Sequence, residues 1–224
     1  TAVAGTAVAS TNNALVVAAP CWNCKILPVR VTNLAGGSSN TSALTAGVIW
    51  AADHGAKIAS ASFGNSDADL SYHLTFRNAA AYMQSRGGIV TISSGNYNNY
   101  RLNTDDPTIL VISATNQSDG SAYFSRRGNN IDLAAPGISI ISTGVGNGHT
   151  SGTGTSVSAP MVAGVAGLIY SVNPSLTGPQ VQQILKDSAD KVGGEITVTN
   201  FDNTTTNCAY NGNGWSPCYG FGRI

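Results

Sequence analysis

The stretch Gly154-Thr155-Ser156-Val157-Ser158-Ala159-Pro160 leads into a run of small and apolar residues that extends to Tyr170. That run is apolar on nearly every side of a helix, which predicts a helix buried all round. Ser156 then lies at the helix N-terminus, where free backbone N–H groups and the helix dipole favour developing negative charge. Pro160 is expected in the first turn, where its missing N–H costs little. The pattern is typical of a nucleophilic serine held at the start of a rigid, buried helix. The alternative is a Gly/Ser-rich loop before an ordinary core helix.

The composition is that of one large globular domain. The chain has 224 residues, 42% hydrophobic and 10% charged, and its eleven basic side chains balance eleven acidic ones. This balance gives no net field to attract nucleic acid or an anionic membrane surface. A continuous apolar stretch of about 18 residues, which a membrane span needs, is missing. We expect no membrane segment, no nucleic-acid partner and a monomer.

Four cysteines indicate an oxidising compartment, and hence a secreted or extracellular protein. Cys21 and Cys24 form a C-x-x-C pair, and Cys208 and Cys218 are ten positions apart. Three pairings are possible, and loop length favours the local one, Cys21–Cys24 with Cys208–Cys218. A four-cysteine zinc site is the alternative, but the second pair is too widely spaced for a zinc knuckle.

Apolar periodicity predicts alternating strands and helices. Strands are expected at residues 25–31, 58–62, 89–93, 108–114, 131–133 and 138–142, and helices at 1–10, 41–54, 70–86, 156–170 and 177–188. Thr177 and Gln180 form a capping-box pattern at the start of the last helix. Most strands are continuous apolar runs, which favours a parallel sheet covered on both faces. Gly64, Asn96 and the loop before Ser156 follow strands, where the sites of open α/β sheets gather.

The Ser156 segment resembles the nucleophile motif of the subtilisin-like serine proteases, G-T-S-x-(S/A)-(A/S)-P followed by a small, apolar helix. Segments 113–128 and 132–137 resemble two further motifs of that family, in the same order along the chain. The resemblance implies an α/β fold of three layers, a mostly parallel sheet with helices on both faces. It also implies a serine endopeptidase that acts on polypeptides through an acyl-enzyme on Ser156.

The resemblance further implies an oxyanion donor and two walls of a substrate pocket. Ser93-Ser94-Gly95-Asn96 is similar to the family's A-(A/S)-G-N, which assigns oxyanion stabilisation to Asn96. A turn asparagine at a strand end is the alternative. Residues 60–64 resemble a strand that pairs with substrate, so Ser62, Phe63 and Gly64 are expected in one wall and Ser93, Ser94 and Gly95 in the other. Because these walls are uncharged, a broad, mainly apolar preference is expected before the scissile bond.

The catalytic aspartate and histidine of the family are not evident here. Asp53 and His54 are neighbours on a predicted helix and do not face each other. His73 lies in a predicted helix, and His149 lies in a glycine-rich loop. Thr1-Ala2-Val3-Ala4-Gly5 resembles the residues that follow the family's catalytic histidine, and residues 219–224 resemble a motif that the family continues with a further helix. We therefore expect residues 1–224 to be an internal part of one peptidase domain, inactive without its triad partners.

Three alternatives stay open to different degrees. A non-catalytic peptide-binding module of the same fold has no need of both Ser156 and Asn96. A nucleotide-binding domain is disfavoured because neither Gly-x-Gly before the helix completes G-x-G-x-x-G. An α/β-hydrolase is disfavoured because Ser156 is not in G-x-S-x-G. The expected chemistry requires no cofactor. Calcium is common in the resembling family, and oxygen ligands for an unassigned site are available from Asp67, Asp69, Asp105 and Asp106.

Overall fold

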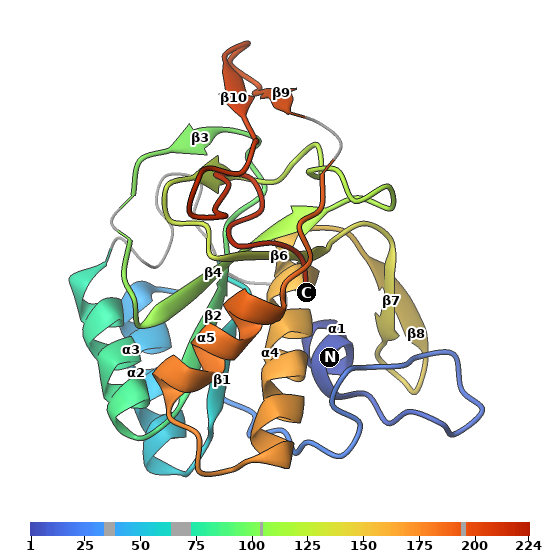
Figure 1. The fold of residues 1–224 in the computed structure, drawn as a ribbon. Coiled ribbons are helices and arrows are strands. Elements are labelled where there is room, and N and C mark those ends of the chain that lie inside the picture. The colour runs from blue at the N-terminus through green and yellow to red at the C-terminus, as the bar shows by residue number, and fades with distance from the viewer. Residues whose placement is uncertain (34–38, 64–72, 104, 194–195) are drawn as a thin grey trace.

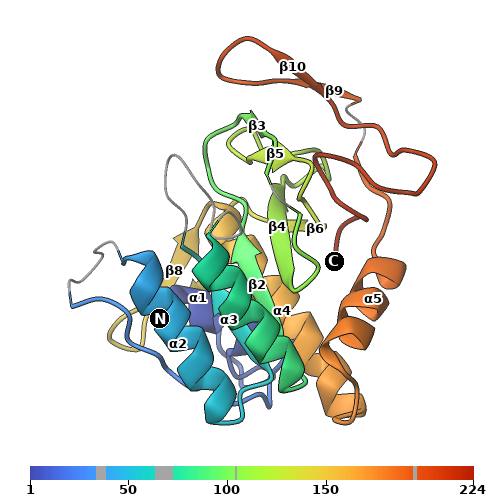
Figure 2. The ribbon, with the colours of Figure 1, turned by 90° about the vertical axis from the view of Figure 1, so that its left-hand side faces the viewer.

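A four-stranded parallel sheet forms the centre of the protein (Figures 1 and 2). A computed structural model describes residues 1–33, 39–63, 73–103, 105–193 and 196–224. The strand order is β1-β2-β4-β6, and all three neighbouring pairs are parallel. The strands are β1 (Ile58–Ala61), β2 (Ile89–Ser93), β4 (Ile109–Thr115) and β6 (Leu133–Pro136).

Helices cover both faces of this sheet, which confirms the predicted three-layer α/β architecture. One face packs against α2 (Thr41–Asp53) and α3 (Leu74–Ser85). The other packs against α4 (Thr155–Val172) and α5 (Gly178–Ser188). The short helix α1 (Ala2–Val8) packs against α4.

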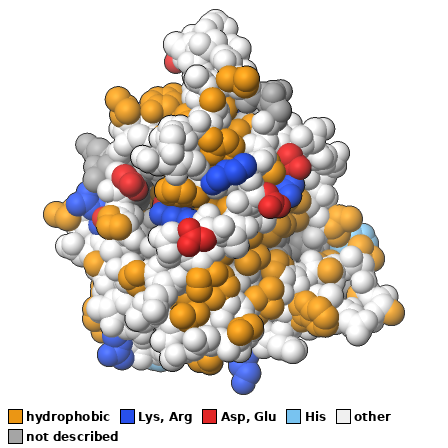
Figure 3. Space-filling view, viewed as in Figure 1, with side chains coloured by type: hydrophobic (Ala, Val, Ile, Leu, Met, Phe, Trp, Pro, Cys, Tyr) orange, Lys and Arg blue, Asp and Glu red, His pale blue; other side chains and the backbone are white. Residues whose placement is uncertain are grey.

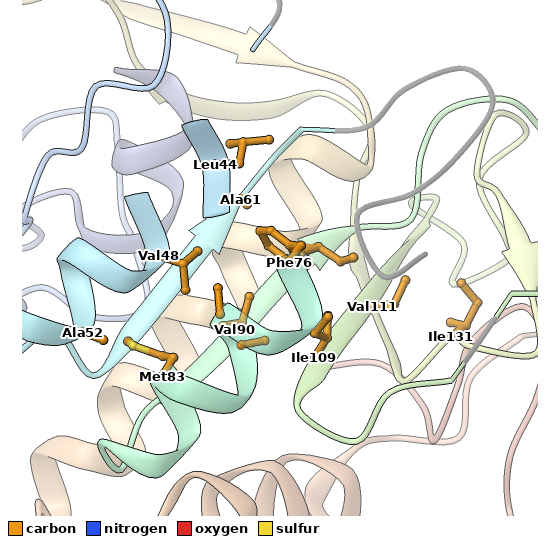
Figure 4. Packing of buried hydrophobic residues seen from close by; sticks show 13 residues of the cluster. Leu44, Val48, Ala52, Ala61, Phe76, Met83, Val90, Ile109, Val111 and Ile131 are labelled. Carbon is orange, nitrogen blue, oxygen red and sulfur yellow. The ribbon is translucent and has the colours of Figure 1, made fainter. Parts of the chain in front are cut away.

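The continuous apolar strands arise because successive side chains enter opposite layers. In β2, Ile89 packs with α4 and α5, whereas Val90 and Ile92 pack with α2 and α3. In β4, Val111 packs in the same cluster as Val90 and Ile92, which Figure 4 shows around Phe76. A strand buried on both sides cannot alternate between apolar and polar residues, so its sequence is a short apolar run.

The remaining strands form three small pairs at the periphery of the sheet. They are the parallel pair β3 (Tyr100–Arg101) and β5 (Arg127–Gly128), and the antiparallel hairpins β7 (Ile140–Thr143) with β8 (His149–Gly152) and β9 (Thr197–Thr199) with β10 (Thr205–Asn207). The β9–β10 hairpin projects beyond the rest of the molecule (Figure 1).

The strand predicted at residues 25–31 is wrong. This segment has no regular secondary structure: Ile26 and Leu27 are exposed, and Val29 and Val31 lie against Gly47 of α2. A cavity of about 890 Å³ separates it from β1, with Val29 and Val31 on one side and Ile58 and Phe63 on the other. A strand needs a neighbour about 4.8 Å away to complete its hydrogen bonds, and the cavity occupies that place.

The disulfides Cys21–Cys24 and Cys208–Cys218 are both formed. This is the local pairing that loop length favoured in the sequence. The first disulfide packs against α4, since a Cβ at Gly167 would lie 2.8 Å from Cys24 Sγ. The predicted capping box of α5 is also confirmed. The Gln180 side-chain oxygen accepts hydrogen bonds from the backbone N–H and the hydroxyl of Thr177.

The prediction that an apolar stretch of about 18 residues is missing is wrong: helix α4 is long and apolar enough to cross a membrane by length and composition, but 61% of it is buried inside the protein. It therefore has the surroundings of a core helix. On the face seen in Figure 3, positive and negative side chains lie close to one another rather than in patches of one sign.

Candidate active site at the N-terminus of α4

Ser156 lies in the first turn of α4, and its exposure differs from that of its neighbours. Thr155 and Val157 are buried, whereas Ser156 is partly exposed. The turn is closed by a hydrogen bond from Val157 N to Gly154 O, and Gly154 N donates to Gly137 O at 2.8 Å. The structure thus places the predicted nucleophile where a substrate can reach it, on a helix that begins at Thr155.

Gly154 has a backbone conformation that its neighbours require. Its φ is +147°, which side chains rarely adopt, and a Cβ there would lie 3.1 Å from Asn96 Nδ2. A residue without a side chain lets the chain enter α4 while the Asn96 amide lies directly against it.

Asn96 follows β2 and is held by Thr155, the residue before the nucleophile. Its Oδ1 accepts from the backbone N–H and the hydroxyl of Thr155, both at 2.9 Å, and Thr155 Oγ1 in turn accepts from Gly95 N at 3.1 Å. These bonds fix the amide plane and assign its oxygen. The Asn96 NH₂ group lies against Gly154, 3.1 Å from where a Cβ of that glycine would be, and its role as an oxyanion donor stays a prediction.

The first-turn position predicted for Pro160 is wrong. Since α4 begins at Thr155, Pro160 lies in its second turn, inside the helix. A proline there supplies no N–H to the carbonyl four residues earlier, which belongs to Ser156. The Ser62 hydroxyl donates to that carbonyl at 2.7 Å.

The structure brings some of the predicted pocket residues to the site and buries others. Ser62 and Phe63 are partly exposed after β1, and Phe63 packs against the cluster formed with α2 and α3. Ser93, Ser94 and Gly95 are buried. Gly64 lies outside the described residues.

Arg126 lies behind the buried wall. Its guanidinium is 3.2 Å from where a Cβ of Gly95 would be, and it stacks over the Tyr97 ring at 5.2 Å from the centroid. The Ser94 hydroxyl donates to Arg126 O at 3.3 Å. Through these contacts, Arg126 packs against residues 94–97, the segment that carries Asn96.

Sequence reasoning missed the roles of Thr155 and Ser62 in holding the nucleophile. Thr155 is part of the motif at residues 154–160. The one local signal of its role is its position between Ser156 and Gly154, whose φ is positive. Ser62 is 94 residues from Ser156, so its bond depends on the fold and has no local pattern.

The three histidines lie on three different elements of the protein. His54 caps α2, with Nδ1 2.8 Å from Trp50 O and its ring stacked on the Trp50 indole. His73 precedes α3, and His149 begins β8 in an exposed position. The expectation that none of the three is the base of Ser156 stays a prediction.

Two of the four aspartates considered for calcium, Asp105 and Asp106, lie within the described residues. Asp106 forms an ion pair with Arg77 Nε at 3.0 Å and accepts hydrogen bonds from the backbone N–H and the hydroxyl of Thr108. Both carboxylate oxygens of Asp106 are therefore bonded within the protein. Asp67 and Asp69 lie outside the described residues. Among the residues the structure describes, His, Cys, Asp and Glu side chains form no group of three that could hold a metal ion.

Comparison with known proteins identifies relatives along most of the chain. Residues 1–222 match the model of the subtilase family. The chain is 35% identical over 195 residues to alkaline elastase YaB of Bacillus sp. strain YaB, a match that covers 86% of the chain and 50% of that protein. It is 34% identical to thermitase of Thermoactinomyces vulgaris, covering 87% of the chain and 68% of thermitase.

A solved structure of a protease from Pseudoalteromonas arctica PAMC 21717 superimposes with a TM-score of 0.76 at 32% identity, covering 85% of this chain and 63% of that one. The chain spans about half the length of several curated relatives that it matches. Because the family model matches nearly the whole length of this chain, the chain belongs to the subtilase family.

Proposed function

We propose that the protein containing this chain is a serine endopeptidase that hydrolyses polypeptides through an acyl-enzyme on Ser156. The observation that carries the proposal is the set of hydrogen bonds between Asn96 and Thr155. They hold an amide donor beside a partly exposed serine at a helix N-terminus. Membership of the subtilase family supports the same reaction class.

In the proposed reaction, Ser156 Oγ attacks the scissile carbonyl carbon and loses its proton to a general base. The carbonyl electron pair moves to the oxygen, and the resulting oxyanion accepts hydrogen bonds from Asn96 Nδ2 and Ser156 N. Collapse of this intermediate expels the amine and leaves an ester on Ser156, which water then hydrolyses. Every step draws on side-chain and backbone groups, so we propose no required cofactor. We leave a stabilising calcium site unassigned.

We place the base and the carboxylate that orients it outside residues 1–224. His54 and His149 support this, because His54 Nδ1 lies 2.8 Å from Trp50 O at the C-terminus of α2 and His149 is exposed in the β7–β8 hairpin. The resemblance of residues 1–5 to the segment that follows the family's histidine supports it as well. The isolated 224-residue chain is therefore proposed to be nearly inactive.

The substrate preference is proposed to be broad and mainly apolar before the scissile bond, because Ser62 and Phe63 carry no charge. We also propose an extracellular protein, for which the two disulfides are the support. We propose that it is a monomer. Its partners are polypeptide substrates rather than nucleic acids, in keeping with the zero net charge.

The test is covalent labelling of the full-length protein with a fluorophosphonate, together with hydrolysis of peptide nitroanilides. We expect label on Ser156, and loss of both label and hydrolysis in Ser156→Ala. A protein that binds peptides but takes no label would instead be a non-catalytic module of this fold. Vigorous hydrolysis by residues 1–224 alone, abolished by Ser156→Ala, would refute the placement of the base outside them.

A further inference from the structure

The carbonyl of Ser156 lacks the donor that an α-helix ordinarily gives it. In a regular helix the N–H of residue 160 would donate to the carbonyl of residue 156. Residue 160 is proline, which has no N–H. The nucleophile is thus carried by a turn whose backbone ladder is interrupted at the nucleophile itself.

Ser62 supplies the missing hydrogen bond from a different element. Its Oγ lies 2.7 Å from Ser156 O in a part-buried contact. Ser62 directly follows strand β1 of the sheet, which ends at Ala61. An unpaired, buried carbonyl is costly, so this bond favours one position of the first turn of α4 relative to the sheet.

The nucleophile is therefore restrained from two sides. Thr155, on one side, is bonded to Asn96 and Gly95 after β2. Ser156, on the other, is bonded through its carbonyl to Ser62 after β1. Errors of about 1 Å in a reacting group are enough to lower rates strongly, so such restraints bear on catalysis.

We propose that Ser62 is a positioning residue for the acylation step, which fixes the backbone of Ser156 through its carbonyl. The proposal rests on the proposed function and deepens it, since it assigns the Ser62 hydroxyl to the nucleophile rather than to substrate. A residue that only forms a pocket wall changes KM, and its effect depends on the side chain bound there. A residue that positions the nucleophile changes kcat equally for all substrates.

The test measures acylation of the full-length protein with peptide nitroanilides that differ only in the residue before the scissile bond. For Ser62→Ala we expect kcat to fall about tenfold for every substrate, the size expected for one lost hydrogen bond, with KM unchanged. Ser62→Thr keeps the hydroxyl and is expected to restore most of the rate. Ser171→Ala is the matched control, because Ser171 Oγ also donates at 2.7 Å to a carbonyl of α4, that of Leu168 near the far end of the helix.

Pro160→Ala gives a second test that does not depend on the stability of Ser62→Ala. It returns an N–H to position 160, so Ser156 O regains a donor from within α4. We expect Ser62→Ala to lower kcat much less in the Pro160→Ala background than in the native one.

Three outcomes would overturn the inference. One is native kcat in Ser62→Ala while Ser156→Ala is inactive, which leaves the proposed function intact. Another is an effect on KM confined to certain substrates, which is the behaviour of a pocket wall. The third is an equal loss from Ser62→Ala in both backgrounds. Hydrolysis that survives Ser156→Ala would instead overturn the proposed function, and this inference with it.

Discussion

Thr155 directs both its backbone N–H and its hydroxyl to the loop that carries Asn96. Its N–H and hydroxyl donate to the amide oxygen, and its hydroxyl oxygen accepts from Gly95 N. An asparagine at a strand end could otherwise turn either its oxygen or its NH₂ toward the nucleophile. The two donors from Thr155 remove that choice, so the residue beside the nucleophile determines which group faces a developing oxyanion.

Replacing Thr155 by valine should therefore impair catalysis while leaving substrate binding largely intact. The change keeps the shape but removes the hydroxyl, which costs Asn96 one donor and leaves buried Gly95 N–H without its acceptor. A loss of about 1–3 kcal/mol corresponds to roughly tenfold to a hundredfold in kcat. Steady-state kinetics of the full-length protein measure it, with Thr155→Ser as the variant expected to retain activity. Equal rates for the valine and serine variants would contradict the role given to the hydroxyl.

Elements buried on two faces could be predicted from the sequence, whereas elements defined by a distant partner could not. Residues 89–93 form the predicted strand because each of its side chains enters a core layer. The segment 25–31 has a similar composition but lacks a neighbour on the ladder. The β9–β10 hairpin was missed because it consists of Thr, Asn and one valine, without an apolar alternation.

The same distinction applies to the candidate site. Ser156 could be proposed as the nucleophile because a helix start is a local feature, whereas the oxyanion role of Asn96 came from the family resemblance, and both roles stay predictions. The Ser62 bond to Ser156 is nonlocal, and the second-turn place of Pro160 depends on where α4 begins, which local propensity sets only within a residue or two. The bond from the Ser94 hydroxyl to Arg126 O joins residues 32 positions apart and likewise has no local signal.

Asp132 joins three elements and should make stability depend on pH. It directly precedes β6, accepts from Val111 N of β4 at 2.9 Å and binds Lys186 Nζ of α5 at 2.7 Å. Burial raises the pKa of this carboxyl from 3.8 to about 6, against the lowering effect of Lys186. The folded protein therefore holds this proton more tightly than the unfolded chain does. The resulting stabilisation is complete below pH 3.8 and is lost as pH rises through about 6.

Asp132→Asn removes this titration. Between pH 4 and pH 7, the free energy of unfolding of the variant should shift by about 2 kcal/mol in its favour relative to the native protein. Urea unfolding at a series of pH values, followed by tryptophan fluorescence, measures the shift, and Asp187→Asn on the exposed face of α5 is the surface control. Parallel pH profiles for Asp132→Asn and the native protein would show that Asp132 does not titrate in this range.

At the scale of the molecule, the last residues of the chain are tied back to the sheet. Residue 223 forms β-bridges with Ala134 and Asp190, and Tyr219 is buried with Cys208 and Cys218. The Ser113 hydroxyl of β4 donates to Cys218 O at 2.7 Å. The Cys208–Cys218 disulfide thus closes a polar loop at the point where the C-terminal segment joins the core.

The two disulfides should stabilise the protein unequally, because the unfolded chain loses more freedom when a longer loop is closed. For separations of 10 and 3 residues, loop-closure entropy gives about 2.7 kcal/mol for Cys208–Cys218 and about 1.6 kcal/mol for Cys21–Cys24. Thermal unfolding of the two double Cys→Ala variants compares them, and we expect the lower melting temperature for the Cys208/Cys218 variant. Both pairs contribute buried side chains, so cavity costs partly cancel in the comparison. If removal of Cys21–Cys24 proved the more damaging, its packing against Gly167 of α4, rather than chain entropy, would govern how the covalent links stabilise this fold.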